Sequence, residues 1–453
     1  MAPSKSFEVA IIGGGIAGVT LAIALHYRNV PVTIYEQAPQ FGEVGAGVSF
    51  SPNAVQAMKS CHEGVYKAFD KVCTRNVWPS KQNVWFDYLN GYDKKADGHQ
   101  EAAFTITNSL GQNGVHRARF LDEMVTLIPE GIAKFGKRLD DITEKDDGKL
   151  LMKFLDGTTA EADVVIGCDG IKSRVRQLIV GVDHPSAYPT YTHKYAYRGL
   201  IPMEKAVEVL GEERAKNACM HVSIVDVPIF LDQGKLTILQ MGPDGHLLTF
   251  AVSHGTILNI VAFRTQSEDW PDYQRLTRRA RREDALRDFA DYGANVINLL
   301  KLTEENLDVW AIFDLGENPV PTFYKGRLAI SGDAAHATSP HHGAGAGLCI
   351  EDSAILAELF ADENVKTQQD LEGVLAAFDA SRRERGQWLV QSSRFIGDSY
   401  EWRADGVGDD FKKIESEIIR RNGIISDIDM GKLIAEAKAD LKQRLSLPGR
   451  SNL

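Results

Sequence analysis

The chain of 453 residues has little cysteine, and its five cysteines form no CxxC pair. An odd number of separated thiols argues against a disulfide framework or a zinc cluster and suits a reducing compartment. The first residues lack the apolar stretch of a secretory signal peptide. No segment has the ~20 consecutive apolar residues of a membrane-spanning helix. These absences predict a cytoplasmic protein with no bound metal and no membrane span.

Positive charge is also in deficit, since 51 Lys and Arg residues stand against 62 Asp and Glu residues. The formal net charge is −11, whereas nucleic-acid binding needs a basic surface. We therefore expect no nucleic-acid partner. The one arginine-rich run, Arg278 to Arg282, falls in a charged stretch over 272–300 that is interpreted as the solvated face of a helix.

The first motif that is present is a GxGxxG sequence directly after a predicted strand, Phe7–Ile12. Gly13 permits a tight turn, Gly15 lets the backbone approach a pyrophosphate, and Gly18 lets the next helix pack closely on the strand. The free N–H groups and dipole at the start of that helix favour phosphate. The motif predicts a dinucleotide site, and by itself it does not separate FAD from NAD.

A βαβ unit surrounds this motif, because a helix is predicted over Val19–Arg28 and a second strand over Pro31–Glu36. Glu36 lies 18 residues after Gly18, where a carboxylate can accept hydrogen bonds from a ribose diol. No second GxGxxG motif follows in the sequence. A separate nicotinamide-nucleotide domain is therefore not predicted.

Two later segments also place an aspartate after an apolar strand. The strand Asp163–Ile166 precedes Asp169-Gly170, and the strand Arg327–Ile330 precedes Gly332-Asp333. An aspartate in this position can bind a ribityl hydroxyl, and small residues at a following helix start let backbone N–H groups approach an anionic ring edge. For the Asp169 segment, a hairpin turn with a helix N-cap is the plain structural alternative.

Between these two segments the sequence is rich in β-strand signals. Glycines and prolines separate the runs, which favours an antiparallel sheet inserted into an α/β chain. The strands are predicted at Tyr195–Ile201, Lys235–Met241, His246–Val252 and Leu258–Phe263. Residues 81–108 also favour strands, whereas the chain from Glu351 onward is predicted to be helical.

Together the three segments resemble the single-component FAD-dependent aromatic hydroxylases, the family of para-hydroxybenzoate and salicylate hydroxylases. The GxGxxG motif with Glu36, the Asp169-Gly170 segment and the Gly332-Asp333 segment have the order and separation of that family. The likeness runs from about Phe7 to Arg394. It is greatest to the salicylate hydroxylase branch, which includes fungal monooxygenases of polyketide phenols.

The resemblance implies an α/β fold with three parts. A discontinuous Rossmann-like FAD-binding domain would comprise residues 1–80, 105–190 and 315–365. An inserted antiparallel β-sheet domain that binds substrate would comprise residues 81–104 and 191–314. Residues 366–453 would form a helical carboxyl-terminal region.

The resemblance also assigns cofactor contacts residue by residue. Gly13, Gly15, Gly18 and Glu36 would bind the ADP half of FAD. The loop Gly45–Ser49, with Gly47 and Ser49, would approach FAD through its backbone. The remaining contacts would be Arg117 near the ribityl-phosphate chain, Asp333 at a ribityl oxygen, Pro340, Gly345 and Ala346 along the isoalloxazine ring, and Asp169 in handling both FAD and NAD(P)H.

The family chemistry implied by the resemblance uses NADPH or NADH as a transient reductant and O2 as co-substrate. A flavin C4a-hydroperoxide then transfers oxygen to an electron-rich phenolate. Arg198, on the predicted strand Tyr195–Ile201, would be the catalytic residue that pairs with the phenolate; a purely structural arginine is the alternative. Phe250-Ala251 stands where relatives usually have Tyr-Pro, so no tyrosine role is expected there.

We therefore expect an enzyme that hydroxylates a small phenolic substrate, as a monomer or homodimer. The favoured reaction is hydroxylative dearomatisation of a polyketide-type phenol in secondary metabolism. The alternatives are decarboxylative hydroxylation of the salicylate 1-monooxygenase type and, less favoured, flavin-dependent epoxidation of an alkene.

Overall fold

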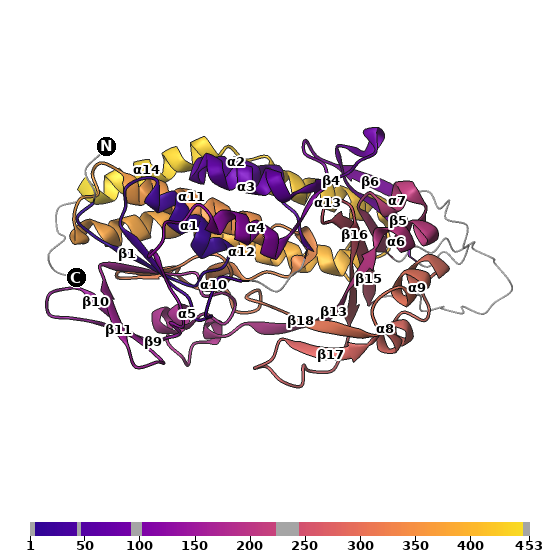
Figure 1. The fold of residues 1–453 in the computed structure, drawn as a ribbon, viewed down its shortest axis with the longest axis horizontal. Coiled ribbons are helices and arrows are strands. Elements are labelled where there is room, and N and C mark those ends of the chain that lie inside the picture. The colour runs from indigo at the N-terminus through magenta and orange to yellow at the C-terminus, as the bar shows by residue number, and fades with distance from the viewer. Residues whose placement is uncertain (1–4, 43–46, 92–101, 223–243, 447–453) are drawn as a thin grey trace.

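The computed structural model describes residues 5–42, 47–91, 102–222 and 244–446. The molecule is elongated, with a parallel sheet toward one end, a large antiparallel sheet toward the other, and long helices along one side (Figure 1). The predicted fold class is confirmed: the chain is α/β with an antiparallel sheet and a helical carboxyl-terminal region. The strand predicted at Lys235–Met241 and the first part of the loop Gly45–Ser49 lie outside the described residues.

The first sheet has six strands in the order β19-β20-β12-β1-β2-β8. All neighbours pair in parallel except β19 with β20. The strands are β1 (Val9–Ile12), β2 (Val32–Tyr35), β8 (Ala133–Lys134), β12 (Val164–Gly167), β19 (Tyr324–Lys325) and β20 (Leu328–Ile330). Because β1, β12 and β20 are adjacent and parallel, their carboxyl ends meet at one edge of the sheet.

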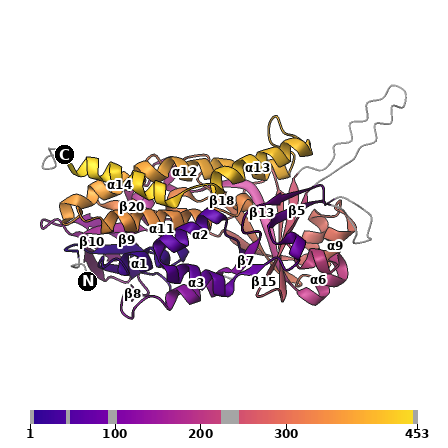
Figure 2. The ribbon, with the colours of Figure 1, turned by 90° about the horizontal axis from the view of Figure 1, so that it is seen from above.

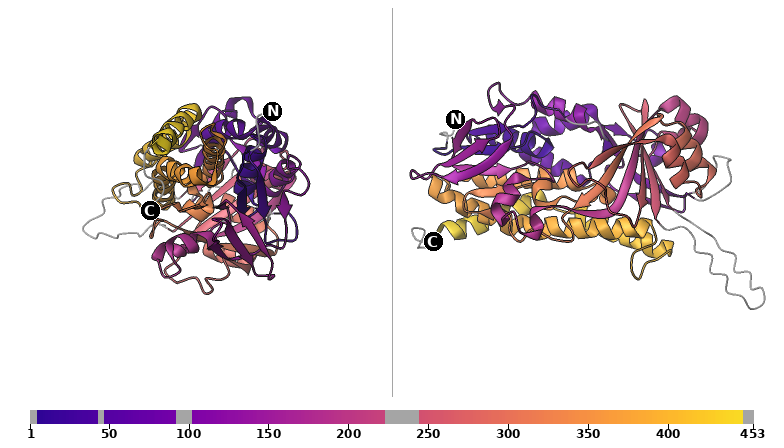
Figure 3. Two further views of the ribbon diagram at one scale, coloured as in Figure 1. Left: turned by 90° about the vertical axis from the view of Figure 1, so that its left-hand side faces the viewer. Right: turned by 90° about the horizontal axis from the view of Figure 1, so that it is seen from below.

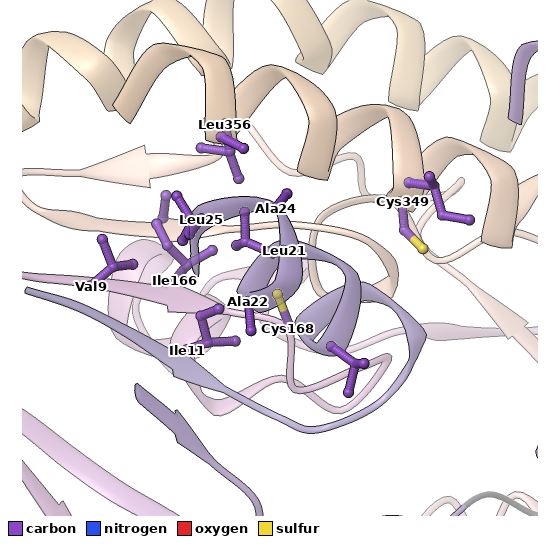
Figure 4. Packing of buried hydrophobic residues seen from close by; sticks show 14 of the residues in the cluster. Val9, Ile11, Leu21, Ala22, Ala24, Leu25, Ile166, Cys168, Cys349 and Leu356 are labelled. Atoms are coloured by element: carbon purple, nitrogen blue, oxygen red, sulfur yellow. The ribbon is translucent and has the colours of Figure 1, made fainter. Parts of the chain in front are cut away.

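Helices cover this sheet and give it a continuous apolar core. The glycine-rich turn leads into α1 (Ile16–His26), which packs against α11 (Gly345–Ala361). Side chains of β1, β12 and both helices interdigitate there, and Leu25 and Leu356 are fully buried (Figure 4). The other helices of this end are α2 (Pro52–Cys61), α3 (Glu63–Val72), α4 (Arg117–Val125), α5 (Arg174–Val180), α10 (Asp333–His336), α12 (Leu371–Tyr400) and α14 (Met430–Ser446).

The second sheet has eight strands in the order β17-β18-β13-β16-β15-β14-β5-β6. Only β14 and β5 pair in parallel; the other neighbours are antiparallel. The strands are β5 (Val84–Asn90), β6 (Phe104–Thr107), β13 (Thr190–Pro202), β14 (Cys219–Val222), β15 (Gly245–Val252), β16 (Ile257–Thr265), β17 (Thr277–Arg281) and β18 (Asn306–Asp314). β6 thus joins this sheet, although it crosses the expected domain boundary at residue 104.

Short helices cover the outer face of the eight-stranded sheet, and its inner face turns toward the rest of the molecule (Figures 2 and 3). The outer helices are α6 (Met203–Leu210), α7 (Glu212–Ala215), α8 (Arg282–Asp288) and α9 (Ala294–Lys301). α13 (Phe411–Ser426) lies beyond the end of α12 and contacts β6. The inner face is therefore the face available to a site between the two sheets.

Short elements complete the fold. Two small three-stranded sheets contain β3 (Gly47–Val48), β4 (Thr74–Arg75) and β7 (Asn113–His116), and β9 (Leu139–Glu144), β10 (Leu150–Phe154) and β11 (Thr159–Ala162). The 3-10 turns are η1 (Pro79–Lys81), η2 (Pro185–Ala187), η3 (Pro340–His342) and η4 (Gln368–Asp370). No helix in the described ranges has both the length and the apolar composition to cross a bilayer.

The arginine run is a strand and not the helix face predicted from its charge. Thr277 to Arg281 form the edge strand β17, and a helix begins only at Arg282. Pairing with β18 decides this conformation, because Arg279 lies opposite Asp308 and forms an ion pair with it at 3.1 Å. The exposed arginines also suit an edge strand, where charge discourages pairing with other chains.

Candidate functional site

Only glycine fits at two positions where β1 leads into α1, one in the turn and one in the helix. Gly13 has φ of 106°, and a Cβ there would lie 2.3 Å from the Cys168 backbone oxygen and 3.1 Å from the Asp169 Cα. A Cβ on Gly18 would lie 2.0 Å from the Gly13 oxygen. The close approach of β1, α1 and the end of β12 therefore depends on these two glycines, as the motif predicts.

The start of α1 is open to an anion. Gly15 is the N-cap residue, no side chain caps the helix, and its first turn has no acidic residue. The Glu36 carboxylate lies beside this turn, where it accepts hydrogen bonds from the N–H groups of Gly14 at 2.5 Å and Ala38 at 2.7 Å. Each carboxylate oxygen has a further lone pair, so these bonds leave Glu36 able to accept from a ribose hydroxyl.

Asp169 follows β12 and caps the next helix. One carboxylate oxygen accepts from the Ser173 hydroxyl at 2.5 Å, and the other accepts from the N–H groups of Arg174 at 2.7 Å and Val175 at 3.1 Å. Burial raises the pKa of this carboxyl, and these hydrogen bonds act in the opposite direction. The side chain of Asp169 therefore acts as a helix cap, which was the structural alternative for this segment. The backbone at Cys168 and Asp169 lies against the glycine turn.

The third strand end brings Asp333 to the same place. A Cβ on Gly332 would lie 3.1 Å from the Cys349 Cβ and 3.2 Å from the Ala17 Cβ, so this turn lies between α1 and α11. Asp333 is exposed and begins α10. In the part of the chain that the structure describes, no group donates a hydrogen bond to its carboxylate. Glu36, Asp169 and Asp333 thus converge around one turn, with Asp333 free to bind a ligand hydroxyl.

A buried ion network behind Asp333 holds its turn in place, and no sequence pattern indicates its pairings. Asp352 accepts from the Gly332 N–H at 3.1 Å and from Arg382 Nε at 2.8 Å, and it pairs with His336 Nε2 at 2.6 Å. Arg382 also donates to Glu351 at 2.7 Å. Asp352 and Arg382 lie 30 residues apart, on different helices, so no local motif could have indicated the pairing.

The loop Pro340–Ala346 places a second open helix start near the two sheets. α11 begins at Gly345 after Ala344, without a side-chain cap and without an acidic residue in its first turn. Pro340 is exposed. A Cβ on Gly343 would lie 3.8 Å from Trp85 Cζ2, which belongs to β5 of the eight-stranded sheet. The predicted ring-binding loop therefore borders the inner face of that sheet.

Gly47, Ser49 and Arg117 join this region from other elements. Gly47 pairs with His116 across β3 and β7, and Arg117 is the first residue of α4. Ser49 is buried. Burial raises the pKa of the Cys349 thiol and lowers the pKa of the Arg198 guanidinium. The charge of Arg117 acts on both groups in the lowering direction, so Arg117 lies within electrostatic reach of both sheets' sites.

Arg198 lies on the inner face of the eight-stranded sheet. Its guanidinium carbon is 4.5 Å from the centre of the Trp310 ring, and its buried Nε has no hydrogen-bond partner. Burial lowers the pKa of Arg198 to about 10, with Arg117 acting in the same direction, so the group is a cation at neutral pH. The structural alternative, an arginine bound to loop carbonyls or a carboxylate, finds no such bond among the described residues.

The arrangement fits an extended dinucleotide with a flavin. Two helix starts offer uncapped N–H groups, the glycine turn admits a close backbone approach, and the exposed Asp333 carboxylate has no hydrogen-bond donor of the described chain. The buried Arg198 Nε is a donor left for a ligand. No group of three His, Cys, Asp or Glu side chains within the described ranges is placed to hold a metal ion.

Comparisons with known proteins agree with this geometry. A family model described as an FAD binding domain matches residues 6–196 and 246–393. An FAD-dependent monooxygenase of Monascus ruber is 44% identical over 97% of each chain. A salicylate hydroxylase of Sarocladium schorii is 39% identical over 88% of this chain and 84% of its own. The solved structure of a salicylate hydroxylase substrate complex superposes with a TM-score of 0.80 at 32% identity, covering 95% of this chain and 98% of that one.

Proposed function

The chain belongs to the FAD-dependent monooxygenases of the FAD-binding-domain family, with salicylate hydroxylase among its relatives, and from that premise we propose that it hydroxylates a small phenol with NAD(P)H and O2. Membership confirms the resemblance inferred from the three strand-end segments. The observation that carries the proposal is the half-buried Arg198 cation on the inner face, which lies beside an aromatic ring and has a buried Nε donor without a partner.

FAD, when bound, supplies reduction by a nicotinamide nucleotide and oxygen activation. The chain would hold it through the backbone at Gly13, Gly15 and Gly18, the carboxylates of Glu36 and Asp333, and the Pro340–Ala346 loop. Gly47, Ser49, Arg117 and Asp169 are proposed as the further contacts. These residues would fix the ring system at the inner face of the eight-stranded sheet, where Arg198 lies.

The substrate ring would rest on a small apolar surface of that face. Ala196, Leu248, Val261, Phe263 and Ile312 form one cluster there. Apolar walls exclude water, which strengthens electrostatic interactions and limits side reactions. Arg198 would stabilise the phenolate form of the substrate, because a fixed cation in a dry site lowers the pKa of a phenol. The phenolate is the electron-rich form that such a hydroxylation needs.

Of the two phenol reactions, we propose hydroxylative dearomatisation of a polyketide-type phenol. Support comes from the fungal FAD-dependent monooxygenases that match nearly the whole chain. The 39% identity to a salicylate hydroxylase favours decarboxylative hydroxylation as the second candidate. Both reactions use the same Arg198, so they differ in the substrate and in the release of CO2.

The test is a panel of phenols that contains salicylate, substituted resorcinols and 2,4-dihydroxybenzaldehyde. We expect a yellow protein that consumes NADPH or NADH with O2, faster when a suitable phenol is present, and a product heavier by one oxygen. CO2 release from salicylate would select the second candidate. A yellow protein whose NAD(P)H consumption and product yield respond to no phenol, but which oxygenates an isolated alkene, would replace the proposal with epoxidation.

A further inference from the structure

A buried polar cluster lies between the inner face of the eight-stranded sheet and the end of α12. His246 Nδ1 is 3.1 Å from one Glu401 oxygen. The other Glu401 oxygen accepts from Lys194 and, at 2.6 Å, from Thr265. Lys194 also lies 3.1 Å from the Asp398 carboxylate, whose side chain is 40% exposed while that of Glu401 is 0% exposed. The cluster thus runs from a buried imidazole to a carboxylate in solvent.

His341 continues this cluster toward the loop that would border the flavin. It follows Pro340 in η3, and its ring centre is 5.2 Å from that of His246 and 5.0 Å from that of Phe263. A Cβ on Gly397 of α12 would lie 2.3 Å from His341 Cδ2, so the helix has a glycine where this ring packs. His341 therefore packs between α12 and His246.

Three ring nitrogens of these two histidines are buried without a hydrogen-bond partner: His246 Nε2 and both nitrogens of His341. Because Glu401 faces His246 Nδ1, that nitrogen carries the proton and donates it, which leaves the lone pair on Nε2. Buried polar atoms without partners are rare and costly. Three of them at one place indicate groups kept for a proton or a ligand.

Both imidazoles are neutral at pH 7 and can accept a proton. Burial is the largest influence and lowers the pKa of each, although Glu401 acts in the opposite direction. Glu401 stays ionised because Lys194 and His246 hold its pKa below the usual range against the effect of burial. The titratable and charged groups that face the pair are Lys194 from β13, Tyr400 and Glu401 from the end of α12, and His342 from η3.

The cluster shares its face of the sheet with Arg198. Arg198 lies opposite Val261 across β13 and β16, and His246 lies opposite Phe263 across β15 and β16. Side chains of directly paired residues point to the same face, and positions two apart in a strand do so as well. Cation and base therefore stand on one face with the apolar Val261 and Phe263 between them.

We propose that His341, His246, Glu401, Lys194 and Asp398 form a relay that takes the phenolic proton from the substrate to solvent. The proposal rests on the phenol hydroxylation proposed above and names the groups that prepare its phenolate. The O–H bond of the phenol breaks, its electron pair stays on oxygen near Arg198, and the proton binds His341.

The rest of the transfer restores every group to its starting charge. The rings of His341 and His246 lie with their centres 5.2 Å apart and share no hydrogen bond, so His341 must first turn its other nitrogen toward His246 Nε2 before it releases a proton there. His246 then passes its Nδ1 proton to Glu401. Lys194 gives one proton to Asp398 and takes one from Glu401. Asp398 then releases a proton to water. One proton leaves for each phenol ionised, and no oxidation or reduction takes place. Each imidazole ends in its other tautomer and regains the first one by rotation of its ring or by return of a proton.

The test follows ionisation alone, in oxidised FAD-loaded enzyme without NAD(P)H. The probe is 2,4-dihydroxybenzaldehyde, whose near-ultraviolet absorption moves to longer wavelength when the phenol loses its proton. Rapid mixing in weak buffer with a pH-indicator dye would record phenolate formation and proton release together. For the wild type we expect both signals to appear at one rate, with one proton per phenolate.

His246→Asn is the principal variant, because the Asn amide can keep the hydrogen bond to Glu401 while it lacks Nε2. We expect phenolate formation to slow roughly 100-fold, the range of a general acid–base contribution, with flavin content and melting temperature preserved. Glu401→Gln should slow it similarly. His221→Asn is the matched control: His221 is also buried in this sheet, but it pairs with Leu247 and so faces the outer side.

Ionisation at the wild-type rate in His246→Asn or in Glu401→Gln would overturn the relay and leave the proposed function intact. If His246→Asn does not retain flavin, Glu401→Gln decides by the same measurement. A flavin-loaded wild type that neither ionises this phenol nor turns over any phenol of the panel would overturn the proposed function, and the relay with it.

Discussion

The two ends of the molecule assemble their functional groups in different ways. At the six-stranded sheet, Glu36, Asp169 and Asp333 each follow a strand of one parallel sheet, so short motifs deliver them to one edge. At the eight-stranded sheet, the polar groups come one at a time from separate strands and from a helix end. Lys194 and Glu401 touch across 207 residues of sequence. The groups proposed to bind the cofactor are therefore specified by local motifs, whereas the groups proposed to act on the substrate are brought together by the fold. The two regions are called the cofactor end and the substrate end, after these proposed roles.

Buried charge differs between the two ends as well. In the network at α11 and α12, both oxygens of Glu351 and of Asp352 are bonded, mostly to the cations Arg382 and Arg385. In the cluster at the inner face, neutral imidazoles keep nitrogens without partners. Satisfied carboxylates between cations fix a turn in one conformation. Neutral rings with unpartnered nitrogens are suited to exchange a proton, which carboxylates held between cations are not.

The largest effect is expected from Arg382→Ala at the cofactor end. Arg382 is fully buried, and its loss would leave the buried Glu351 and Asp352 charges short of a partner. Breaking a buried ion pair from one side lowers the free energy of unfolding by about 3 to 5 kcal/mol. Urea unfolding followed by tryptophan fluorescence measures this change. Arg383→Ala, on the same helix but 39% exposed, should cost less than about 1 kcal/mol; equal losses would refute the distinction between the two arginines.

Arg198→Ala tests the substrate end. Removing the cation that would face the phenolate should reduce product formation roughly 100- to 1000-fold, as loss of one preorganised donor does, while flavin content stays at the wild-type level. Product mass and flavin absorbance measure the two quantities separately. Arg198→Lys should recover part of the activity, because it keeps the charge without the planar guanidinium. Arg279→Ala on the exposed edge of the same sheet is the control, and full turnover by Arg198→Ala would remove this residue from the site.

Asp333→Ala should produce a largely colourless protein that excess FAD restores. Loss of a charge-assisted hydrogen bond to a ribityl oxygen costs about 1.5 to 3 kcal/mol, which corresponds to a Kd for FAD raised roughly 10- to 100-fold. Titration of apoprotein with FAD measures the change. Asp146→Ala, exposed between β9 and β10, is the control. If added FAD restores activity to Asp333→Ala but not to Arg198→Ala, the two ends have different roles. A fully yellow Asp333→Ala protein would count against the assignment.

The sequence predicted the cofactor end well because its signals are local. The glycine turn and the apolar strands β1 and β12 were found to within about two residues, since glycine spacing and short apolar runs determine them. α1 begins at Ile16, three residues before the predicted start, because the motif's own last residues already form its first turn. The positions of Glu36, Asp169 and Asp333 at one edge of the sheet follow from strand order alone.

The substrate end could not be predicted to the same depth. A helix was predicted for the arginine run because its charge is typical of a solvated helix face. The run forms a strand instead, because pairing with β18 outweighs that local preference. No sequence pattern indicated Glu401. It is the residue that caps the carboxyl end of α12, and its contact with His246 forms only where this helix end meets the eight-stranded sheet. Such contacts depend on where α12 ends relative to the sheet, and no sequence spacing encodes that.

The smallest effect is expected from Phe250→Tyr, which asks whether the substrate end lacks a catalytic tyrosine or has no room for one. Phe250 is 5% exposed, and a Cβ on Gly47 would lie 2.5 Å from the ring carbon Cζ, which carries the hydroxyl in tyrosine. The added oxygen would therefore press on the Gly47 backbone, and such overpacking costs about 1 to 3 kcal/mol. We expect a lower melting temperature and a modest loss of product, against no change for the exposed control Phe135→Tyr. A gain in product from Phe250→Tyr would instead place this position within the reaction site and give the sheet a second group that acts on the substrate.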